Sequence, residues 1–290
     1  MNNVENKRKN NIFFSVILTT FNSEIYIKSA LRNLFFQKFK EFEVIVIDDG
    51  STDNTLKIVK KYKDKLNFKI LSLKHSGSPA RSRNLGIKYS RGKYLCFFDC
   101  DDSFYSEKLY RLHNLIKKNN SDVFYHDVYL KEVNKNLYCK IVEKKNPFKD
   151  LILNGNKIVL SSSCVKKKFL KNNKIKFNET KKFISVEDYD FWIKIAKNNG
   201  KFFLIQKILG AYNLNQFSIS KNRITHYLNT LNLLNYYKKS LNNYKLSFLI
   251  RKIRVTVSFI KISIYEKNTN FLLFKLKSLL RLKSTYNELR

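Results

Sequence analysis

The first half of the chain alternates short apolar runs with segments of helical periodicity. The runs predicted as buried strands are Phe13 to Leu18, Phe42 to Ile47, Phe68 to Leu73, Tyr94 to Phe98 and Val123 to Val128. Between the first two runs, Ile27, Ala30, Leu31 and Leu34 recur at helical spacing, which predicts a helix with one apolar face. Strands that alternate with helices of this length indicate an α/β fold with a mostly parallel sheet and crossover helices.

The pattern is weaker after the fifth run. Leu137 to Val142 and Ile158 to Val165 are predicted as strands, and Lys166 to Lys171 as a basic helix. Val186 to Asn199 then shows helical periodicity, and Phe202 to Tyr212 is predicted as a further extended segment. The sequence therefore predicts elements in this region but not their order in the sheet.

The composition changes after Ser220, where acidic residues nearly vanish. One face of a predicted helix carries Leu246, Leu249, Ile250, Ile253, Val257, Ile260 and Ile264, and the opposite face carries Phe248, Val255, Phe259 and Ile262. Such a helix can dock on the protein by one face and offer the other to a membrane or partner, although its β-branched residues leave a strand open as an alternative. We therefore expect a domain over residues 1–218 and a basic, mainly helical extension over residues 219–290.

The chain is strongly basic, with 57 Lys and Arg against 23 Asp and Glu and a formal net charge of +34. An excess of this size indicates nucleic acid, anionic lipid or a phosphorylated ligand as partner, unless it reflects a coding bias towards Lys, Asn and Ile. The sequence contains no recognition module for nucleic acid, and its acids cluster where a ligand is expected to bind. Nucleic acid is therefore an unlikely partner, and an anionic membrane surface is a candidate partner of the extension.

The cysteines and the apolar runs indicate the cellular compartment of the protein. Cys96, Cys100, Cys139 and Cys164 form no paired CxxC set, so reduced thiols are expected. The apolar run near the N-terminus is short and is followed by no small-residue cleavage site, and no uncharged run reaches the ~18 residues of a membrane span. We expect a cytoplasmic protein, or one that is peripheral on the inner face of the cytoplasmic membrane.

Carboxylates follow two of the predicted strands directly. Asp99, Asp101 and Asp102 come after the fourth strand, and Asp48 and Asp49 come after the second. In an open α/β sheet the ligand crevice lies at the carboxyl ends of the strands, and a divalent cation that bridges phosphates needs one or two carboxylates. The pattern predicts a site for a metal and a diphosphate, with a solvated acidic turn that caps the next helix as the alternative.

Five segments carry a resemblance to a known family: Ser15 to Asn22, Val44 to Asp53, Gly77 to Gly86, Gly92 to Asp102 and Glu187 to Trp192. In this order they resemble the motifs of family 2 glycosyltransferases over residues 12–215. The resemblance implies a GT-A fold, a nucleotide-sugar donor that is most often UDP-linked, Mn²⁺ or Mg²⁺ as cofactor, and inversion at the anomeric carbon. The chain departs from the usual motifs at Thr19, where proline is usual, and at Phe21, where tyrosine is common.

The resemblance also implies roles for individual residues. The predicted nucleotide-binding residues are Thr20, Phe21, Asn22, Asp49, Arg83 and Asp99, and the predicted metal ligands are Asp101 and Asp99. Asp188 is the predicted catalytic base for the acceptor hydroxyl, with Glu187 in support, because a positioned carboxylate can take the proton that the hydroxyl loses. Trp192, one helical turn further on, is a candidate for stacking on the acceptor sugar, with a place in the core as the alternative.

These observations lead to one preferred function and two alternatives. The preferred function is an inverting transferase that extends a cell-surface or lipid-linked glycan, such as lipopolysaccharide or capsule. The alternatives are a basic nucleic-acid-binding protein and a catalytically silent protein of the same fold. Dinucleotide enzymes and P-loop enzymes are disfavoured, because the sequence contains neither GxGxxG nor GxxxxGK[ST].

Overall fold

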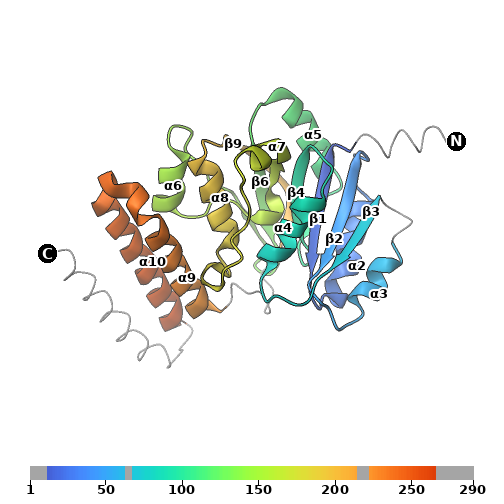
Figure 1. Ribbon diagram of the computed structural model, residues 1–290, viewed down its shortest axis with the longest axis horizontal. Helices are drawn as coiled ribbons and strands as arrows, with labels where there is room; N and C mark the ends of the chain where they lie inside the picture. Colours follow the sequence, from blue (N-terminus) through green and yellow to red (C-terminus); the bar gives the residue numbers. More distant parts are fainter. Residues whose placement is uncertain (1–11, 63–66, 214–221, 266–290) are drawn as a thin grey trace.

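The computed structural model describes residues 12–62, 67–213 and 222–265 (Figure 1). Its strands are β1 Phe14–Thr20, β2 Phe42–Asp48, β3 Phe68–Ser72, β4 Tyr94–Asp99, β5 Ser103–Phe104, β6 Val123–Leu130, β7 Lys135–Leu137, β8 Cys164–Lys166 and β9 Phe202–Tyr212. Its α-helices are α2 Glu24–Phe35, α3 Thr55–Lys60, α4 Pro79–Tyr89, α5 Lys108–Lys118, α6 Pro147–Asn154, α7 Lys167–Asn172, α8 Glu187–Lys197, α9 Arg223–Tyr237 and α10 Lys245–Tyr265. Short 3₁₀ turns cover Leu160–Ser162, Lys181–Phe183 and Lys238–Tyr244.

Within the described residues the strands form one nine-stranded sheet in the order β3-β2-β1-β4-β8-β6-β9-β5, with β7 paired to β6. The strands β3, β2, β1 and β4 are parallel to their neighbours. Their register sets Thr20 beside Asp48 and Thr19 beside Asp99, so the polar strand ends meet at one edge. The predicted α/β fold with a mostly parallel sheet is confirmed.

Helices cover both faces of the sheet, as the alternation of buried residues along the strands requires. On β1, Ile17 faces one core cluster, which α4, α6, α8 and α9 also build. Val16 and Leu18 face the other cluster, built with α2, α3 and α5. Because successive side chains of a strand point to opposite faces, a strand buried on both sides carries a continuous apolar run, as β1 does over Val16 to Leu18 and β2 over Val44 to Ile47.

The second half of the sheet differs from the prediction in two places. The segment Leu137 to Val142 is not a strand beyond Leu137, because the backbone N–H of Val142 donates to the Tyr125 hydroxyl at 3.0 Å and not to a neighbouring strand. The segment Ile158 to Val165 forms a 3₁₀ turn and only then enters β8. The short β8 lies antiparallel between β4 and β6, so β6 is not the direct neighbour of β4.

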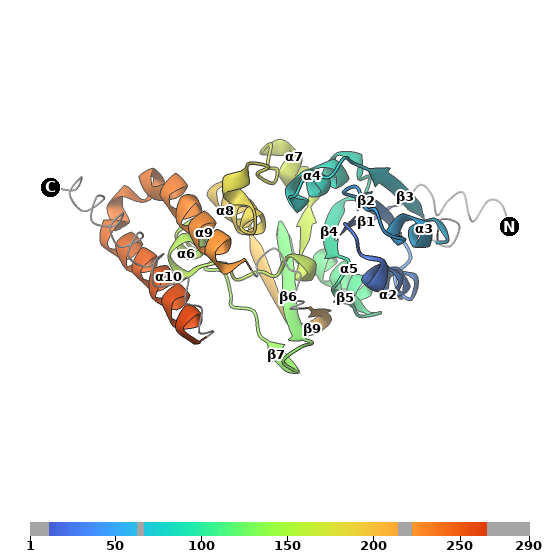
Figure 2. The same cartoon turned by 90° about the horizontal axis from the view of Figure 1, so that it is seen from below.

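The two C-terminal helices lie beyond α8, at the opposite end of the molecule from β3 (Figures 1 and 2). They pack on each other, and α10 also contacts α6 while α9 contacts the Lys181–Phe183 turn. Of the two structures considered for 245–265, the helix is confirmed. One of its predicted faces is buried through Phe248 and Phe259, and the other exposes Leu246 and Ile253. The side chains of Ile262 and Ile264 lie outside the described set. Across the described part of the chain, every helix falls short of the length or the apolar character that crossing a membrane requires.

Candidate active site

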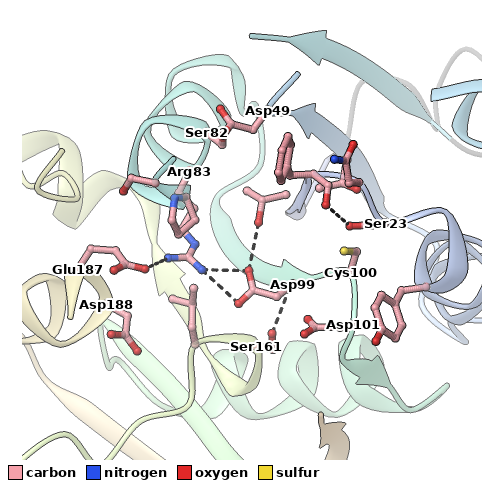
Figure 3. Close-up of a pocket in the computed structure, with 18 of the residues that line it drawn as sticks. Ser23, Asp49, Ser82, Arg83, Asp99, Cys100, Asp101, Ser161, Glu187 and Asp188 are labelled. Carbon is pink, nitrogen blue, oxygen red and sulfur yellow. Dashed lines mark hydrogen bonds and ion pairs between the residues drawn. The ribbon is translucent and has the colours of Figure 1, made fainter. Parts of the chain in front are cut away.

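A cavity of about 730 Å³ opens at the edge of the sheet where β1, β2 and β4 end. Its walls come from segments far apart in the sequence, from the end of β1 to the end of β9. Figure 3 shows Arg83 near its centre, between Asp99 and Glu187. The predicted site residues that line it are Thr20, Phe21, Asn22, Asp49, Arg83, Asp99, Asp101, Glu187 and Asp188. The fold therefore brings together acids that are up to 139 positions apart, from Asp49 to Asp188.

Asp49, the residue predicted to contact the base, lies at one side of the cavity. Its carboxylate accepts hydrogen bonds from the backbone N–H of Ser76 at 3.2 Å and from the Ser76 hydroxyl at 3.0 Å. Nδ1 of His75 lies 2.9 Å from the same carboxylate, and the His75 ring stacks on Phe21 with ring centroids 3.9 Å apart. Two flat rings beside a hydrogen-bond acceptor form a wall that can hold a nucleobase.

Asn22 holds the loops after β1 and β2 together. Its φ of +43° is in the left-handed region, where Asn is one of the few residues found routinely. Its side-chain oxygen accepts from the N–H of Thr52 at 2.8 Å, and its own N–H donates to the Ser51 hydroxyl at 2.9 Å. Thr20 contributes to the same arrangement, because its carbonyl accepts from the N–H of Asp49 at 2.9 Å. Both residues reach the cavity and also fix the position of Asp49.

Arg83 connects the acidic turn after β4 with the start of α8. One terminal nitrogen donates to Glu187 at 2.7 Å, and the other donates to the two oxygens of Asp99 at 3.0 and 3.1 Å. The side chain of Arg83 is only 6% exposed, and although burial alone lowers its pKa, Asp99 and Glu187 raise that pKa above its ordinary value. Arg83 is therefore a fixed cation in the cavity, with its planar fork bound to two carboxylates.

The carboxylates of the acidic turn repel one another. Burial, and then the charge of Asp99, raises the pKa of Asp101 to about 6. Burial and the charge of Asp101 raise the pKa of Asp102 well above its ordinary value, and Asp102 accepts from the N–H of Asn213 at 2.9 Å. Asp99 is held more firmly, since the Thr19 hydroxyl also donates to it at 3.1 Å. Negative charge at this turn thus exceeds what the nearby cations neutralise.

This turn fits a divalent metal that is shared with a ligand. Among the residues described, no three His, Cys, Asp or Glu side chains form a complete metal cluster. Mg²⁺ needs less from the protein, because it keeps several waters and is held by one or two carboxylates together with phosphates. Asp101 is the stronger candidate ligand, because both oxygens of Asp99 already accept from Arg83. The raised pKa of Asp101 marks a carboxylate that a cation would stabilise.

Glu187 and Asp188 begin helix α8 and face the same cavity. Glu187 is buried and paired with Arg83, whereas Asp188 accepts a weak hydrogen bond from the side-chain amide of Asn156 at 3.3 Å. Burial, and then the charge of Glu187, raises the pKa of Asp188 to about 7 against the opposing effect of Arg83. A carboxylate with a pKa near neutral is suited to take a proton from a hydroxyl.

Helix α9 holds the start of α8 in place. Nδ1 of His226 lies 3.1 Å from the carbonyl oxygen of Ser185, and the side-chain amide of Asn229 donates to the carbonyl of Ile184 at 2.9 Å. One turn into α8, the Tyr237 hydroxyl donates to the fully buried Asp190 at 2.7 Å. The position of Asp188 therefore depends on a helix about 40 residues further along the chain.

The structure corrects the prediction for Trp192. Its side chain is fully buried in the core beside Phe191 and is absent from the cavity wall. Trp192 belongs to the core cluster that α8 builds with α4, α6 and α9, so it cannot stack on an acceptor sugar. The alternative of a place in the core is the correct one.

Several residues of the site were not predicted. One of them is His75, and its position just after the predicted strand Phe68 to Leu73, at the ligand edge, is a signal that could have found it. Asn156 and Ser161 come from a segment without a recognisable motif, and the Ser161 hydroxyl accepts from the N–H of Asp99 at 3.1 Å. Behind Ser161, the buried ammonium group of Lys108 donates to its carbonyl, and burial lowers the pKa of Lys108 to about 7. Ser161 and Lys108 come to lie beside the acidic turn only when the chain folds.

Together, the sheet and its cavity define a class of protein. A parallel β3-β2-β1-β4 sheet with an acidic turn after β4 and a cavity at the carboxyl ends of its strands is the arrangement of a GT-A fold. The profile described as "Glycosyl transferase family 2" matches residues 15–172. The chain belongs to glycosyl transferase family 2.

The sequence is similar to curated bacterial proteins. It is 38% identical over 190 residues to the poly(ribitol-phosphate) beta-N-acetylglucosaminyltransferase TarS of Staphylococcus aureus strain Mu50, a match that covers 64% of this chain and 32% of TarS. It is 34% identical over 231 residues to TarP of S. aureus strain N315, with 75% of this chain and 69% of TarP covered. The chain thus spans about a third of the length of TarS.

Solved structures share the fold. S. aureus TarS 1–349 in complex with UDP-GlcNAc superposes with a TM-score of 0.62 at 27% identity, covering 86% of this chain and 81% of that one. The mannosyltransferase PcManGT from Pyrobaculum calidifontis superposes with a TM-score of 0.61 and covers 97% of this chain and 84% of its own, although only 14% of residues are identical. The GT-A fold predicted from the motifs is confirmed.

Proposed function

We propose that this protein is an inverting glycosyltransferase that moves a sugar from a UDP-linked donor to a hydroxyl of a glycan or lipid-linked glycan. The observation that carries the proposal is the convergence of Asp49, Asp101 and Asp188 on one cavity, with the pKa of Asp188 raised to about 7. The catalytic unit in this proposal spans residues 1–218, and residues 219–290 form its extension.

The donor end of the cavity suits uridine diphosphate. The carboxylate of Asp49 can accept the N3–H of uracil while Phe21 offers its ring face to the base. Asp99, held by Arg83, can accept from the ribose hydroxyls. A relative supports this choice, because TarS was solved in complex with UDP-GlcNAc.

The acceptor approaches from the side of α8. Asp188 takes the proton of the acceptor hydroxyl as its oxygen attacks the anomeric carbon, and the bond from that carbon to the diphosphate breaks. UDP leaves with the electron pair of that bond, and this single displacement inverts the configuration. A divalent metal held by Asp101 and the phosphates would neutralise the charge that grows on the leaving diphosphate.

The names of relatives guide the acceptor class. TarS and TarP are named for poly(ribitol-phosphate), and the Escherichia coli relative WfgD for UDP-Glc and α-D-GlcNAc-diphosphoundecaprenol. Both acceptors carry phosphate, which suits a chain with a formal net charge of +34. We place the reaction in cell-surface polysaccharide biosynthesis, with the protein peripheral on the inner face of the cytoplasmic membrane.

A donor screen that measures UDP release tests the proposal. The wild-type chain should release UDP from one UDP-sugar in the presence of Mn²⁺ or Mg²⁺, and chelation should abolish the release. Asp188→Asn should lower the rate by about 10²–10⁴-fold while UDP still binds. Asp101→Asn should lower it and weaken the response to added metal.

The control is Glu107→Gln, which removes a partly exposed acid that pairs with Lys38 and Arg111 outside the cavity and should leave the rate unchanged. Full activity of both Asp101→Asn and Asp188→Asn would overturn the residue assignments. UDP binding without release from any UDP-sugar and acceptor would support a catalytically silent protein instead.

A further inference from the structure

Helix α10 presents a row of apolar side chains to solvent. The members of this α10 stripe, with their exposed fractions, are Leu246 at 71%, Leu249 at 44%, Ile250 at 42%, Ile253 at 52% and Val257 at 42%. They recur every three or four residues, so they share one face of the helix. Single exposed apolar residues are ordinary on protein surfaces, but a contiguous row marks an interaction surface.

The stripe is not the face that attaches α10 to the protein. Phe248 and Phe259 on the opposite face are buried, and Phe259 stacks on Tyr227 of α9 with ring centroids 4.4 Å apart. The Arg251 guanidinium packs against the backbone of Gly155, where an added Cβ would lie 2.7 Å from its nitrogen. The helix is therefore anchored by one face, and the stripe has no role in holding it there.

Positive charge borders the stripe. Residues 222–265 contain no Asp or Glu, and their Lys and Arg residues are Arg223, Lys238, Lys239, Lys245, Arg251, Lys252, Arg254 and Lys261. On the helical wheel, Lys245 and Arg254 flank the stripe on its two sides, and Arg254 is exposed. An apolar face with basic flanks and no acids is the pattern of a helix that lies in the interface of an anionic bilayer.

We infer that the α10 stripe is a docking surface for an anionic lipid membrane, with the helix parallel to the membrane plane and its apolar side chains in the acyl boundary. A second copy of the chain fits this surface less well, because pairing two such helices would bring uncompensated basic residues together. A lipid surface with anionic headgroups satisfies both the apolar stripe and the flanking cations.

The location of the stripe relates it to the proposed reaction. The α9–α10 pair lies beside α8 and α6, on the side from which the acceptor is proposed to approach (Figures 1 and 2). Docking through α10 would bring the start of α8, with Asp188, close to a membrane that holds a lipid-linked acceptor. The inference rests on the proposed function only for the biological role of membrane binding. The binding itself is measured without catalysis.

Co-sedimentation of the full chain with lipid vesicles tests the inference. The wild type should bind vesicles of mixed phosphatidylcholine and phosphatidylglycerol and should bind vesicles of phosphatidylcholine alone much less. The triple variant Leu246→Ser, Ile253→Ser, Val257→Ser should lose about tenfold or more of the partition into the mixed vesicles, since each buried apolar side chain contributes to binding. Raising the salt concentration should weaken wild-type binding because it screens the headgroup charge.

The matched control is Phe36→Ser with Tyr110→Ser, two aromatic residues that are 57% and 48% exposed. Phe36 directly follows α2 and Tyr110 is on α5, and both helices are distant from α10 in Figure 1. This variant should bind as the wild type does. The far-UV circular dichroism spectrum should be the same for all three proteins, which verifies that the stripe variant is folded. Since the readout is vesicle binding, an inactive transferase would leave this result unaffected.

Three results would overturn the inference. One is equal binding of the stripe variant and the wild type, and another is equal loss of binding in the Phe36 and Tyr110 control. The third is a dimer of the wild type, measured by light scattering, that the stripe substitutions convert to a monomer while vesicle binding stays unchanged. This result would show that the stripe binds a second copy of the chain.

Discussion

The proposed donor side and the proposed acceptor side of the cavity are built by different means. On the donor side, Asp49 and Asp99 stand at the ends of β2 and β4, the two parallel strands that flank β1, so the register of these three strands places them directly. On the acceptor side, Asp188 begins a helix that is held by α9 through contacts of its preceding loop and of Asp190. The carboxyl ends of parallel strands lie at one edge of the sheet because of the strand pairing. The first residues of a helix, by contrast, are positioned only by the side chains and loops that pack around them.

This difference teaches where each side is vulnerable. The donor side depends on many backbone hydrogen bonds of the sheet, which no single side chain controls. The acceptor side depends on a few side chains, and Arg83 is the one that joins the two sides. Substitutions of Arg83 and of residues on the acceptor side should therefore lower stability more than substitutions of exposed neighbouring residues do.

The largest effect on stability is expected from a substitution of Arg83. Arg83→Met removes the cation between Asp99 and Glu187, so the buried Glu187 and the partly exposed Asp99 both lose their partner. Breaking such a pair costs about 3–5 kcal/mol in the free energy of unfolding. Chemical denaturation measures this loss, and UDP release should fall with it.

Arg81→Met on the same helix is the matched control, because Arg81 is exposed. It should change the free energy of unfolding by about 0.5 kcal/mol or less. Equal stabilities of the Arg83 and Arg81 variants would show that the two sides are not joined through Arg83.

The next effect concerns the hold of α9 on α8. Tyr237→Phe removes the hydrogen bond to the buried carboxylate of Asp190, whose other oxygen lies 2.6 Å from the Lys194 ammonium. A hydrogen bond to a charged group contributes about 1.5–3 kcal/mol, and thermal or chemical unfolding should report a loss of this order. Tyr236→Phe, at a neighbouring position that is 66% exposed, should be neutral in the same measurement.

The third effect is in the pH dependence of the rate. Because Asp188 acts as a base only when ionised, kcat/KM should rise with pH up to about 7 and then level off. Its carboxyl has a higher pKa in the folded than in the unfolded chain, so the folded state binds more protons, and the contribution of Asp188 to stability falls as pH rises towards 7. A pH–rate profile without a limb near 7 would argue against Asp188 as the base.

The smallest effect is expected from Asn156→Ala. Loss of the 3.3 Å hydrogen bond to the Asp188 carboxylate removes a group that favours the ionised form, so the limb of the profile should move to higher pH. The shift should be about half a pH unit, because the bond is long and exposed. Unfolding should be unchanged, which separates an effect on the base from an effect on the fold.

Much of the donor side could be predicted from the sequence. Apolar runs of five to seven residues gave β1 to β4, and Asp49, Asp99 and Asp101 were identified because each follows such a run. Such signals are local, since burial on both faces of a strand requires apolar side chains at every position. The predictions for the segments around β7 and β8 were wrong because strands of only three residues leave little periodicity in the sequence.

The acceptor side shows the limit of local signals. The helix over Glu187–Lys197 and its two acids were predicted, yet the same periodicity could not tell that Trp192 faces the core. Periodicity reports that a helix has an apolar face, and only packing shows what that face meets. The His226, Asn229 and Tyr237 contacts to α8 had no signal at all, because each pairs residues more than 40 positions apart.

The sequence by itself determined the parallel strands, the acids that end them and the two-faced helix near the C-terminus, because each rests on a pattern within one short segment. The tertiary structure alone decided the pairing of Arg83 with Glu187 across 104 positions, the burial of Trp192 and the raised pKa of Asp188. The reason is physical: hydrophobic periodicity is a property of neighbours in the chain, whereas the charge and solvation around an ionisable group are set by residues that meet only when the chain folds.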